Sequence, residues 1–366
     1  MRPLPLLLCL GAAAALRRGE LGRERKKDIY FLHIPRTAGT SFISDARLSL
    51  NTFRNNMRLH YDFEHMEGCY AWRNQWPEND PPLMAMMIRR PRQMVYSEYL
   101  LCAEGPVSIM AEVPQPDKDG FKWWIHSWHE YLKEGKGVGD FSNHIGLKPQ
   151  LTIKLPVTYT TLPFECYNPA NMMSQRLTCE LPYKYPESID GDLAVRHMRE
   201  AWFVGLPEVY QESICLFRYK VYAKLPKFCN CEDRASWDEF APKNTSYHEA
   251  RLKSAPLAEQ DERTIAQIDN MTVLDTKLYE AAAERFQREM QEVHQKTGTK
   301  VLCRKLPPAH EKMGRKVREG PPPRPVLQLS EDERREVEEK RREWAEGMKA
   351  DRKTPHSALM DLMKDD

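Results

Sequence analysis

Three continuous apolar runs along the chain, each followed by a segment with helical periodicity, predict strands that alternate with helices. The apolar runs are 28–34, 83–88 and 201–206. Such runs are typical of strands that are buried on both faces of a parallel sheet. The helical segments that follow them are 40–49, 93–102 and 209–222. This alternation indicates an α/β fold, with a central parallel sheet flanked by helices.

A further helix is predicted near the end of this region. Its apolar positions recur every three or four residues, at Ile268, Met271, Leu274, Leu278, Ala282 and Phe286. Glu and Arg residues fill the opposite face, which is the pattern of a helix with one buried side. We expect one long helix that packs across the sheet.

The two ends of the chain differ in character from this middle part. Residues 1–27 hold a short apolar run, 4–16, and a charged linker; the run is typical of a secretory signal peptide or of an uncleaved signal anchor in a membrane. Residues 28–304 are expected to form one large domain. A Pro-rich linker follows at 305–329, and a highly charged helix and tail at 330–366.

Composition narrows the function classes only a little. The 55 Lys and Arg residues nearly balance the 53 Asp and Glu residues, so bulk charge does not indicate a nucleic-acid partner. Apart from Cys9, eight cysteines would permit disulfides in a lumenal protein, although the sequence does not give their pairing. Cys229 and Cys231 are too close together and too isolated for a zinc site, and we expect no metal.

The segment between the first strand and its helix has the features of a phosphate-binding loop. Unpaired backbone N–H groups at a helix start, together with the helix dipole, favour an anion such as a phosphate or a sulfonate. Ala38 and Gly39 let the backbone approach a ligand, Thr40 and Ser41 add hydroxyl donors, and Arg36 adds a permanent cation. The Walker pattern is absent, which disfavours an ordinary nucleotide triphosphatase or kinase.

A second phosphate-binding element is predicted at the end of the second strand. Arg89 follows this strand, and Ser97 lies eight residues later on the next helix. Ligands of open α/β sheets bind at the carboxyl ends of the strands, where these two side chains could hold one further phosphate.

These two elements resemble those of the Golgi carbohydrate sulfotransferases, in particular the heparan-sulfate 6-O-sulfotransferase family. His33 to Phe42 is similar to the family's phosphosulfate loop, and Arg89 with Ser97 is similar to its element for the 3′-phosphate. Further segments match in the same order: Leu59–Asp62, Tyr167–Asn171 with Arg176-Leu177, Val204–Leu206 with Glu208, and Leu274-Asp275 with Leu278-Tyr279. The resemblance covers residues 28–292.

The resemblance implies that residues 28–304 are a sulfotransferase domain with a nucleotide-kinase-like fold. Its cosubstrate would be 3′-phosphoadenosine 5′-phosphosulfate, its acceptor a hydroxyl of a polysaccharide, and its location the Golgi lumen or membrane. Arg89 and Ser97 would hold the 3′-phosphate. The 5′-phosphosulfate would be held by the loop residues His33, Ile34, Pro35, Arg36, Thr37, Ala38, Gly39, Thr40 and Ser41.

Two residues are expected to carry the chemistry. His60 falls on the family's catalytic histidine, and a neutral imidazole suits a base that takes the proton from the acceptor hydroxyl. Arg36 is expected to neutralise the leaving oxygen. His65 is an alternative base, and His33 is expected to support the loop.

The sequence also departs from the family pattern. Arg36 replaces the family's Lys, Ala38 replaces a Gly, Phe63 replaces a Trp, and Met173-Ser174 replace an Arg-Gln pair. Because most of these changes lie where an acceptor is recognised, a non-catalytic nucleotide- or glycan-binding protein on the same fold remains the alternative.

Two further segments, one at Asn244 and one rich in Trp, each have two possible interpretations. Asn244 begins either a glycosylation sequon or a match to the family's N-S-T-R segment that lacks the Arg, and a second sequon begins at Asn270. The Trp-rich stretch of Trp123, Trp124 and Trp128, with His126 and His129, is either core or a surface that stacks on sugars.

Overall fold

The computed structural model describes the backbone of residues 28–52, 58–61, 82–104, 118–133, 168–178, 189–240, 257 and 260–310. The strands are β1 Asp28–Leu32, β2 Arg58–Tyr61, β3 Leu83–Met87 and β4 Phe203–Gly205. The α-helices are α1 Gly39–Thr52, α2 Pro91–Glu104, α3 Lys118–Lys133, α4 Met172–Thr178, α5 Gly191–Glu200, α6 Tyr210–Tyr222, α7 Arg234–Asp238, α9 Glu262–Met271 and α10 Val273–Thr297. Short 3-10 turns cover Pro207–Val209 and Lys227–Cys229.

The described strands form one four-stranded sheet in the order β2-β1-β3-β4, and every neighbouring pair is parallel. The three strands predicted from the apolar runs are confirmed, and so is the α/β class. The edge strand β2 was not predicted, because the alternating polar residues of Arg58–Tyr61 do not form an apolar run. Parallel pairing brings the carboxyl ends of all four strands to one edge of the sheet.

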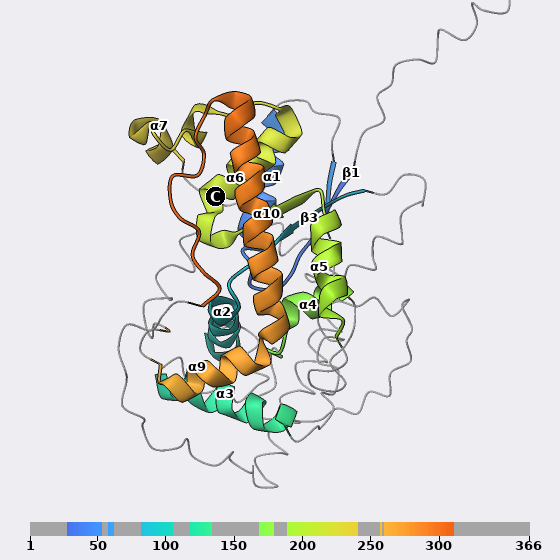
Figure 1. The fold of residues 1–366 in the computed structure, drawn as a ribbon, viewed down its shortest axis with the longest axis vertical. Helices are drawn as coiled ribbons and strands as arrows, with labels where there is room; N and C mark the ends of the chain where they lie inside the picture. The colour runs from blue at the N-terminus through green and yellow to red at the C-terminus, as the bar shows by residue number, and fades with distance from the viewer. Residues whose placement is uncertain are drawn as a thin grey trace, which may run out of the picture.

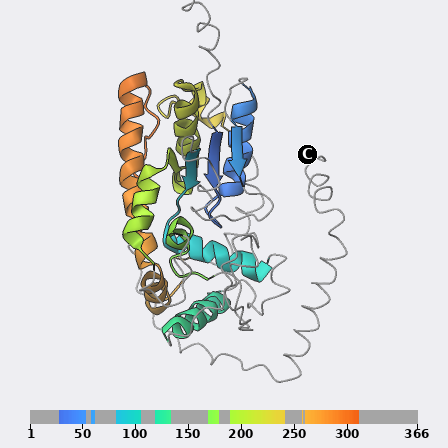
Figure 2. The ribbon, with the colours of Figure 1, turned by 90° about the vertical axis from the view of Figure 1, so that its right-hand side faces the viewer.

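Helices cover both faces of the sheet. Figure 2 shows α10 and α5 on one side of the strands and α1 on the other. On the α1 side, Phe42 stacks on Phe31 of β1 and on Phe203 of β4, with ring centroids 4.8 and 5.2 Å apart. Phe217 of α6 meets the Phe42 ring edge-on at 5.1 Å. This aromatic cluster fixes α1 against the two strands that flank β3 and positions its N-terminus at the carboxyl edge.

The predicted single long helix is wrong, because the chain forms two helices, α9 and α10, that meet at Thr272. Asn171 causes the break. Its backbone N–H donates to the Met271 carbonyl, and its side-chain oxygen accepts from the backbone N–H groups of Leu274, at 2.9 Å, and Asp275. Asn171 therefore caps the start of α10. Figure 1 shows the two helices meeting at an angle.

Asp275 of α10 in turn caps the start of α4. Its carboxylate accepts from the backbone N–H groups of Met173 and Ser174, at 3.1 and 2.8 Å, and from the Ser174 hydroxyl at 2.7 Å. Asn171, just before α4, thus satisfies unpaired N–H groups of α10, and Asp275 of α10 satisfies those of α4. This reciprocal capping joins α4 to α10 in the buried interior, where Asp275 is 1% exposed.

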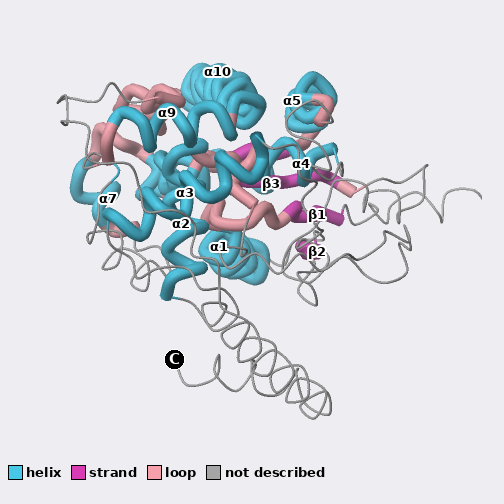
Figure 3. Tube along the Cα trace, turned by 90° about the horizontal axis from the view of Figure 1, so that it is seen from below, coloured by secondary structure: helices cyan, strands magenta, loops and turns pink. Residues whose placement is uncertain are grey.

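Helices α2, α3 and α9 pack together beyond the carboxyl edge of the sheet (Figure 3). Trp124 and Trp128 of α3 are fully buried, and Trp124 lies against Tyr99 of α2 with ring centroids 5.7 Å apart. The core reading of these two tryptophans is therefore confirmed, and a sugar-stacking role for them is wrong. Trp123 is only partly buried.

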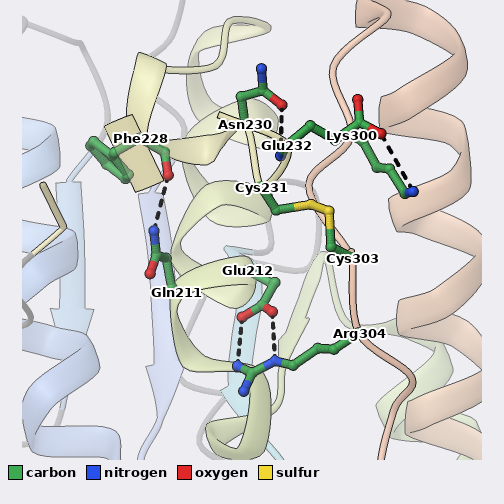
Figure 4. The surroundings of a disulfide bond; sticks show 9 residues. All are labelled: Gln211, Glu212, Phe228, Asn230, Cys231, Glu232, Lys300, Cys303 and Arg304. Carbon is green, nitrogen blue, oxygen red and sulfur yellow. Dashed lines mark hydrogen bonds and ion pairs between the residues drawn. A yellow bond between two sulfur atoms is a disulfide. The ribbon is translucent and has the colours of Figure 1, made fainter. Parts of the chain in front are cut away.

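Two disulfides join the segment after α10 and the loop after α6 to the domain. Cys215 of α6 pairs with Cys229, and Cys231 pairs with Cys303. Beside the second disulfide, Arg304 makes a two-pronged ion pair with the buried Glu212, at 2.8 and 2.9 Å (Figure 4). Cys229 and Cys231, which are close together in the sequence, thus belong to two different disulfides.

The packed unit continues a few residues past the predicted boundary at 304. Leu306 packs against the core, Ala309 is 5% exposed, and the Tyr279 hydroxyl donates to the Pro307 carbonyl at 3.1 Å. The predicted signal or anchor at 1–27 and the charged helix at 330–366 lie outside the described residues. Among the helices described, none combines the length and the apolar character needed to cross a membrane.

We expect Asp275→Asn to lower the free energy of unfolding by about 1–3 kcal/mol. In the wild type the carboxylate accepts from backbone N–H groups of α4, and the Asn amide would replace it with a weaker acceptor and an NH₂ group facing those donors. Burial raises the pKa of Asp275 to about 6, above its ordinary value of about 4. The folded state therefore holds this proton more tightly than the unfolded state. Its contribution to stability is fully present below about pH 4 and is lost as the pH rises to about 6.

The difference in stability between wild type and Asp275→Asn should accordingly shrink from pH 4 to pH 6, as measured by urea unfolding at a series of pH values. Asp192→Asn is the matched control, since Asp192 is exposed on α5. If Asp275→Asn were as stable as the wild type at every pH, the capping role given to Asp275 would be wrong, whereas a difference that widens with rising pH would contradict its raised pKa.

Replacing Cys231 and Cys303 together by Ala should destabilise the domain by about 4 kcal/mol, because this disulfide closes a separation of 72 residues. Urea unfolding without reductant measures the change. Lys300→Ala is the control: it removes only an exposed ion pair to Glu232 and should cost less than about 1 kcal/mol. A double variant as stable as wild type would show that the segment is held without the disulfide.

Candidate functional site

The turn from β1 to α1 has an unusual backbone. Two of its residues that are not glycine, Arg36 and Ala38, adopt left-handed conformations with φ of 59° and 65°. Each costs roughly 1–2 kcal/mol for a residue with a Cβ, so other contacts must hold the turn in place. Strain of this kind is typical of functional loops.

Local contacts explain how the turn is held. The Thr37 hydroxyl donates to the Ile34 carbonyl at 2.8 Å, and the Phe42 N–H donates to the Ala38 carbonyl at 3.0 Å as the first bond of α1. The His33 imidazole lies against Gly39, where an added Cβ would be 2.0 Å from its Cδ2 atom. A larger residue at position 39 would have to displace the His33 imidazole, so His33 packs closely against the start of α1.

The end of β3 is bonded directly to this turn. The Arg89 guanidinium donates from Nη1 to the Arg36 carbonyl at 2.7 Å, and Arg36 donates from Nε to the Ser97 hydroxyl at 3.0 Å. Ser97 lies on α2 and is 2% exposed. The structure therefore brings together Arg36, Arg89 and Ser97, three predicted site residues that are separated by up to 61 positions in the sequence.

Positive charge is concentrated at this point. Burial lowers the pKa of Arg89 to about 10; the carboxylates of Glu208 and Glu98 oppose this shift, and the positive charges of Arg36 and Arg90 add to it. The Arg89 side chain stays protonated at neutral pH. Glu208 also accepts from the Arg90 backbone N–H at 2.8 Å, which fixes the segment after β3. The Arg36 guanidinium donates to the buried Ser97 hydroxyl, and the Arg89 guanidinium donates to the backbone of the same turn, so two cations there favour an anionic ligand.

Sequence analysis missed the support that α4 gives to this site. The Met173 sulfur accepts from the Arg89 backbone N–H at 3.5 Å, and Met173 is fully buried. The reciprocal caps of Asn171 and Asp275 hold the helix start from which Met173 projects. No local pattern signals this contact, since 84 residues separate its two members.

The remaining predicted residues differ in what they can offer a ligand. Ile34, Pro35 and Thr37 are buried, so they would reach a ligand only through the backbone, whereas Thr40 is exposed and Ser41 is partly exposed. His60 lies on β2, in register with Tyr30 of the central strand β1, one residue before β2 ends. β2 is described by its backbone alone. Phe63, His65 and Asn244 lie outside the described residues.

We expect Ala38→Gly to raise the free energy of unfolding by about 1 kcal/mol, because glycine adopts the left-handed conformation without strain. Gly39→Ala should have the opposite effect, since its Cβ would displace the His33 imidazole. Urea unfolding of both variants measures the pair of changes. If Ala38→Gly were neutral or destabilising, the strain inferred for this turn would be wrong.

Comparison with models of known protein families, with curated proteins and with solved structures finds no match for this chain. A function for the site therefore has to be proposed from its own residues and from the motif resemblance.

Proposed function

We propose that the chain is a carbohydrate O-sulfotransferase, similar to the heparan-sulfate 6-O-sulfotransferases, that uses 3′-phosphoadenosine 5′-phosphosulfate. The observation that carries the proposal is the convergence of Arg36, Arg89 and Ser97 at the carboxyl edge of the sheet. The family resemblance names these residues as ligands of one bisphosphorylated nucleotide. Their contact across two separate strand-to-helix junctions supports one shared ligand.

The residues present fit this nucleotide. The strained turn at Arg36 and Ala38 precedes the start of α1, whose N–H groups and dipole favour the 5′-phosphosulfate. Glycine at position 39 allows close approach of the backbone, and Thr40 and Ser41 add hydroxyl donors. Arg89 and Ser97, from the neighbouring strand and helix, would hold the 3′-phosphate. The bound cosubstrate would supply the activated sulfuryl group.

In the proposed reaction the protein supplies a general base and hydrogen-bond donors. His60 would accept the proton of the sugar hydroxyl, because a neutral imidazole binds a proton near neutral pH. Its strand pairs with β1, and both strands end at the same edge of the sheet. Donors from the loop backbone would offset the negative charge that grows during transfer.

The disulfides agree with the proposed location. Cys215–Cys229 and Cys231–Cys303 need an oxidising compartment to persist, and the lumen of the secretory pathway is one. This supports a protein that acts in the Golgi lumen, where polysaccharide acceptors are modified.

A second candidate is a protein on the same fold that binds nucleotide or glycan without turnover. Met173 and Ser174 stand where the family has an Arg-Gln pair, and both side chains are fully buried. Met173 contacts Arg89, and Ser174 donates to Asp275, so neither is directed to an acceptor. Positions 173 and 174, where the family pattern differs, thus serve internal packing in this chain.

Labelled sulfate transfer from the phosphosulfate donor to a panel of polysaccharides tests the two candidates. We expect transfer by the wild type, and a loss of roughly 100-fold or more in His60→Ala, because general-base catalysis contributes about that much. Disaccharide analysis of the product then identifies the sugar and the hydroxyl that carry the sulfate.

His294→Ala is the matched control, since His294 is exposed on α10, away from the sheet edge, and its loss should leave the transfer rate unchanged. Equal transfer by wild type and His60→Ala would rule out His60 as the base. Binding of the spent nucleotide by both proteins without transfer by either would favour the binding protein.

A further inference from the structure

We propose that the guanidinium of Arg36 is a specificity group for the 3′-phosphate of the nucleotide, rather than a cation for the leaving oxygen at the 5′ end. This inference rests on the proposed function and changes the role that the resemblance gave to position 36. The backbone of Arg36 stays in the loop for the 5′-phosphosulfate, while its side chain belongs with Arg89 and Ser97.

The direction of the side chain is the first support. From its left-handed position in the turn, Arg36 extends to α2 and donates from Nε to Ser97, the hydroxyl implied for the 3′-phosphate. Ser97 is 2% exposed on a helix that packs against its neighbours, so its position is fixed. A guanidinium has five N–H donors in a planar fork, enough to contact a hydroxyl and a phosphate oxygen together.

Charge is the second support. The guanidinium of Arg89 is bonded to the carbonyl of Arg36, and the two positive side chains repel each other strongly enough to contribute to the lowered pKa of Arg89. Two cations at one turn attract a doubly charged group more strongly than a singly charged one. A phosphate monoester such as the 3′-phosphate carries about −1.5 to −2 at neutral pH, whereas a phosphate linked on both sides carries a single charge.

The third support is the substitution of Arg for the family's Lys. A lysine presents one point charge and has no planar Nε donor, so it could not make the Nε contact to Ser97 while extending a second pair of donors. Arginine at position 36 can therefore contact Ser97 through Nε and a phosphate through its other N–H groups, which a lysine could not do.

Nucleotide binding by isothermal titration separates the two ends of the ligand. The probes are 3′-phosphoadenosine 5′-phosphate and adenosine 5′-phosphate, which lacks only the 3′-phosphate. We expect Arg36→Ala to weaken binding of the first roughly tenfold or more, and binding of the second by less than about threefold, because a charge-assisted contact is lost only at the 3′ end. Arg36→Lys should restore the preference only in part.

Ser97→Ala should cause the same selective loss, and the double variant should lose little more than Arg36→Ala alone, since the two residues act as one group. Arg47→Ala removes an exposed arginine from α1 and is the control for lost charge, while thermal unfolding of each variant checks that it is folded. Equal weakening of both nucleotides in Arg36→Ala would place the guanidinium at the 5′ end and overturn the inference. Failure of the wild type to bind either nucleotide would instead overturn the proposed function.

Discussion

The hydrogen bond from the Arg89 guanidinium to the Arg36 carbonyl is the contact on which the arrangement of the site depends. It joins the turn after the central strand β1 to the segment after β3, so the two elements proposed to bind phosphate are in direct contact. A carbonyl in a left-handed turn has no partner from a helix or a sheet ladder, and it needs a donor from elsewhere. Arg89 supplies it with a charged group, which makes the bond stronger than a neutral one.

Support for Arg89 reaches back through the fold. Its backbone N–H is bonded to Met173, and Met173 lies in the first turn of α4, whose N–H groups are capped by Asp275 of α10. Asn171 caps α10 in return. A long helix on the face of the sheet therefore determines where a short helix sits, and the short helix determines where the end of β3 lies. Since α10 packs against the rest of the core, the core helps to hold the site in addition to the contacts within the loop.

The sequence predicted those parts of this arrangement that depend on local pattern. β1, β3 and β4 are buried on both faces, so their residues form apolar runs that can be recognised without a partner. β2 lies at the edge and reads Arg-Leu-His-Tyr, which gives no such run. The break at Thr272 was missed because its cause, Asn171, lies 103 residues away from the N–H that it caps. Arg36, Arg89 and Ser97 were found as separate candidates, but a direct bond between two side chains of different subsites has no signature in sequence.

The two departures from the family pattern in the loop have one structural meaning. Arg36 and Ala38 are the two left-handed residues of the turn, and neither is glycine, so the backbone conformation cannot rest on intrinsic preference. It rests on contacts: the Arg89 bond at the Arg36 carbonyl, the Thr37 bond to Ile34, and the imidazole of His33 against Gly39. A turn held in this way keeps its shape before a ligand arrives. Less ordering is then needed on binding, which favours affinity for an anion that fits the preformed turn.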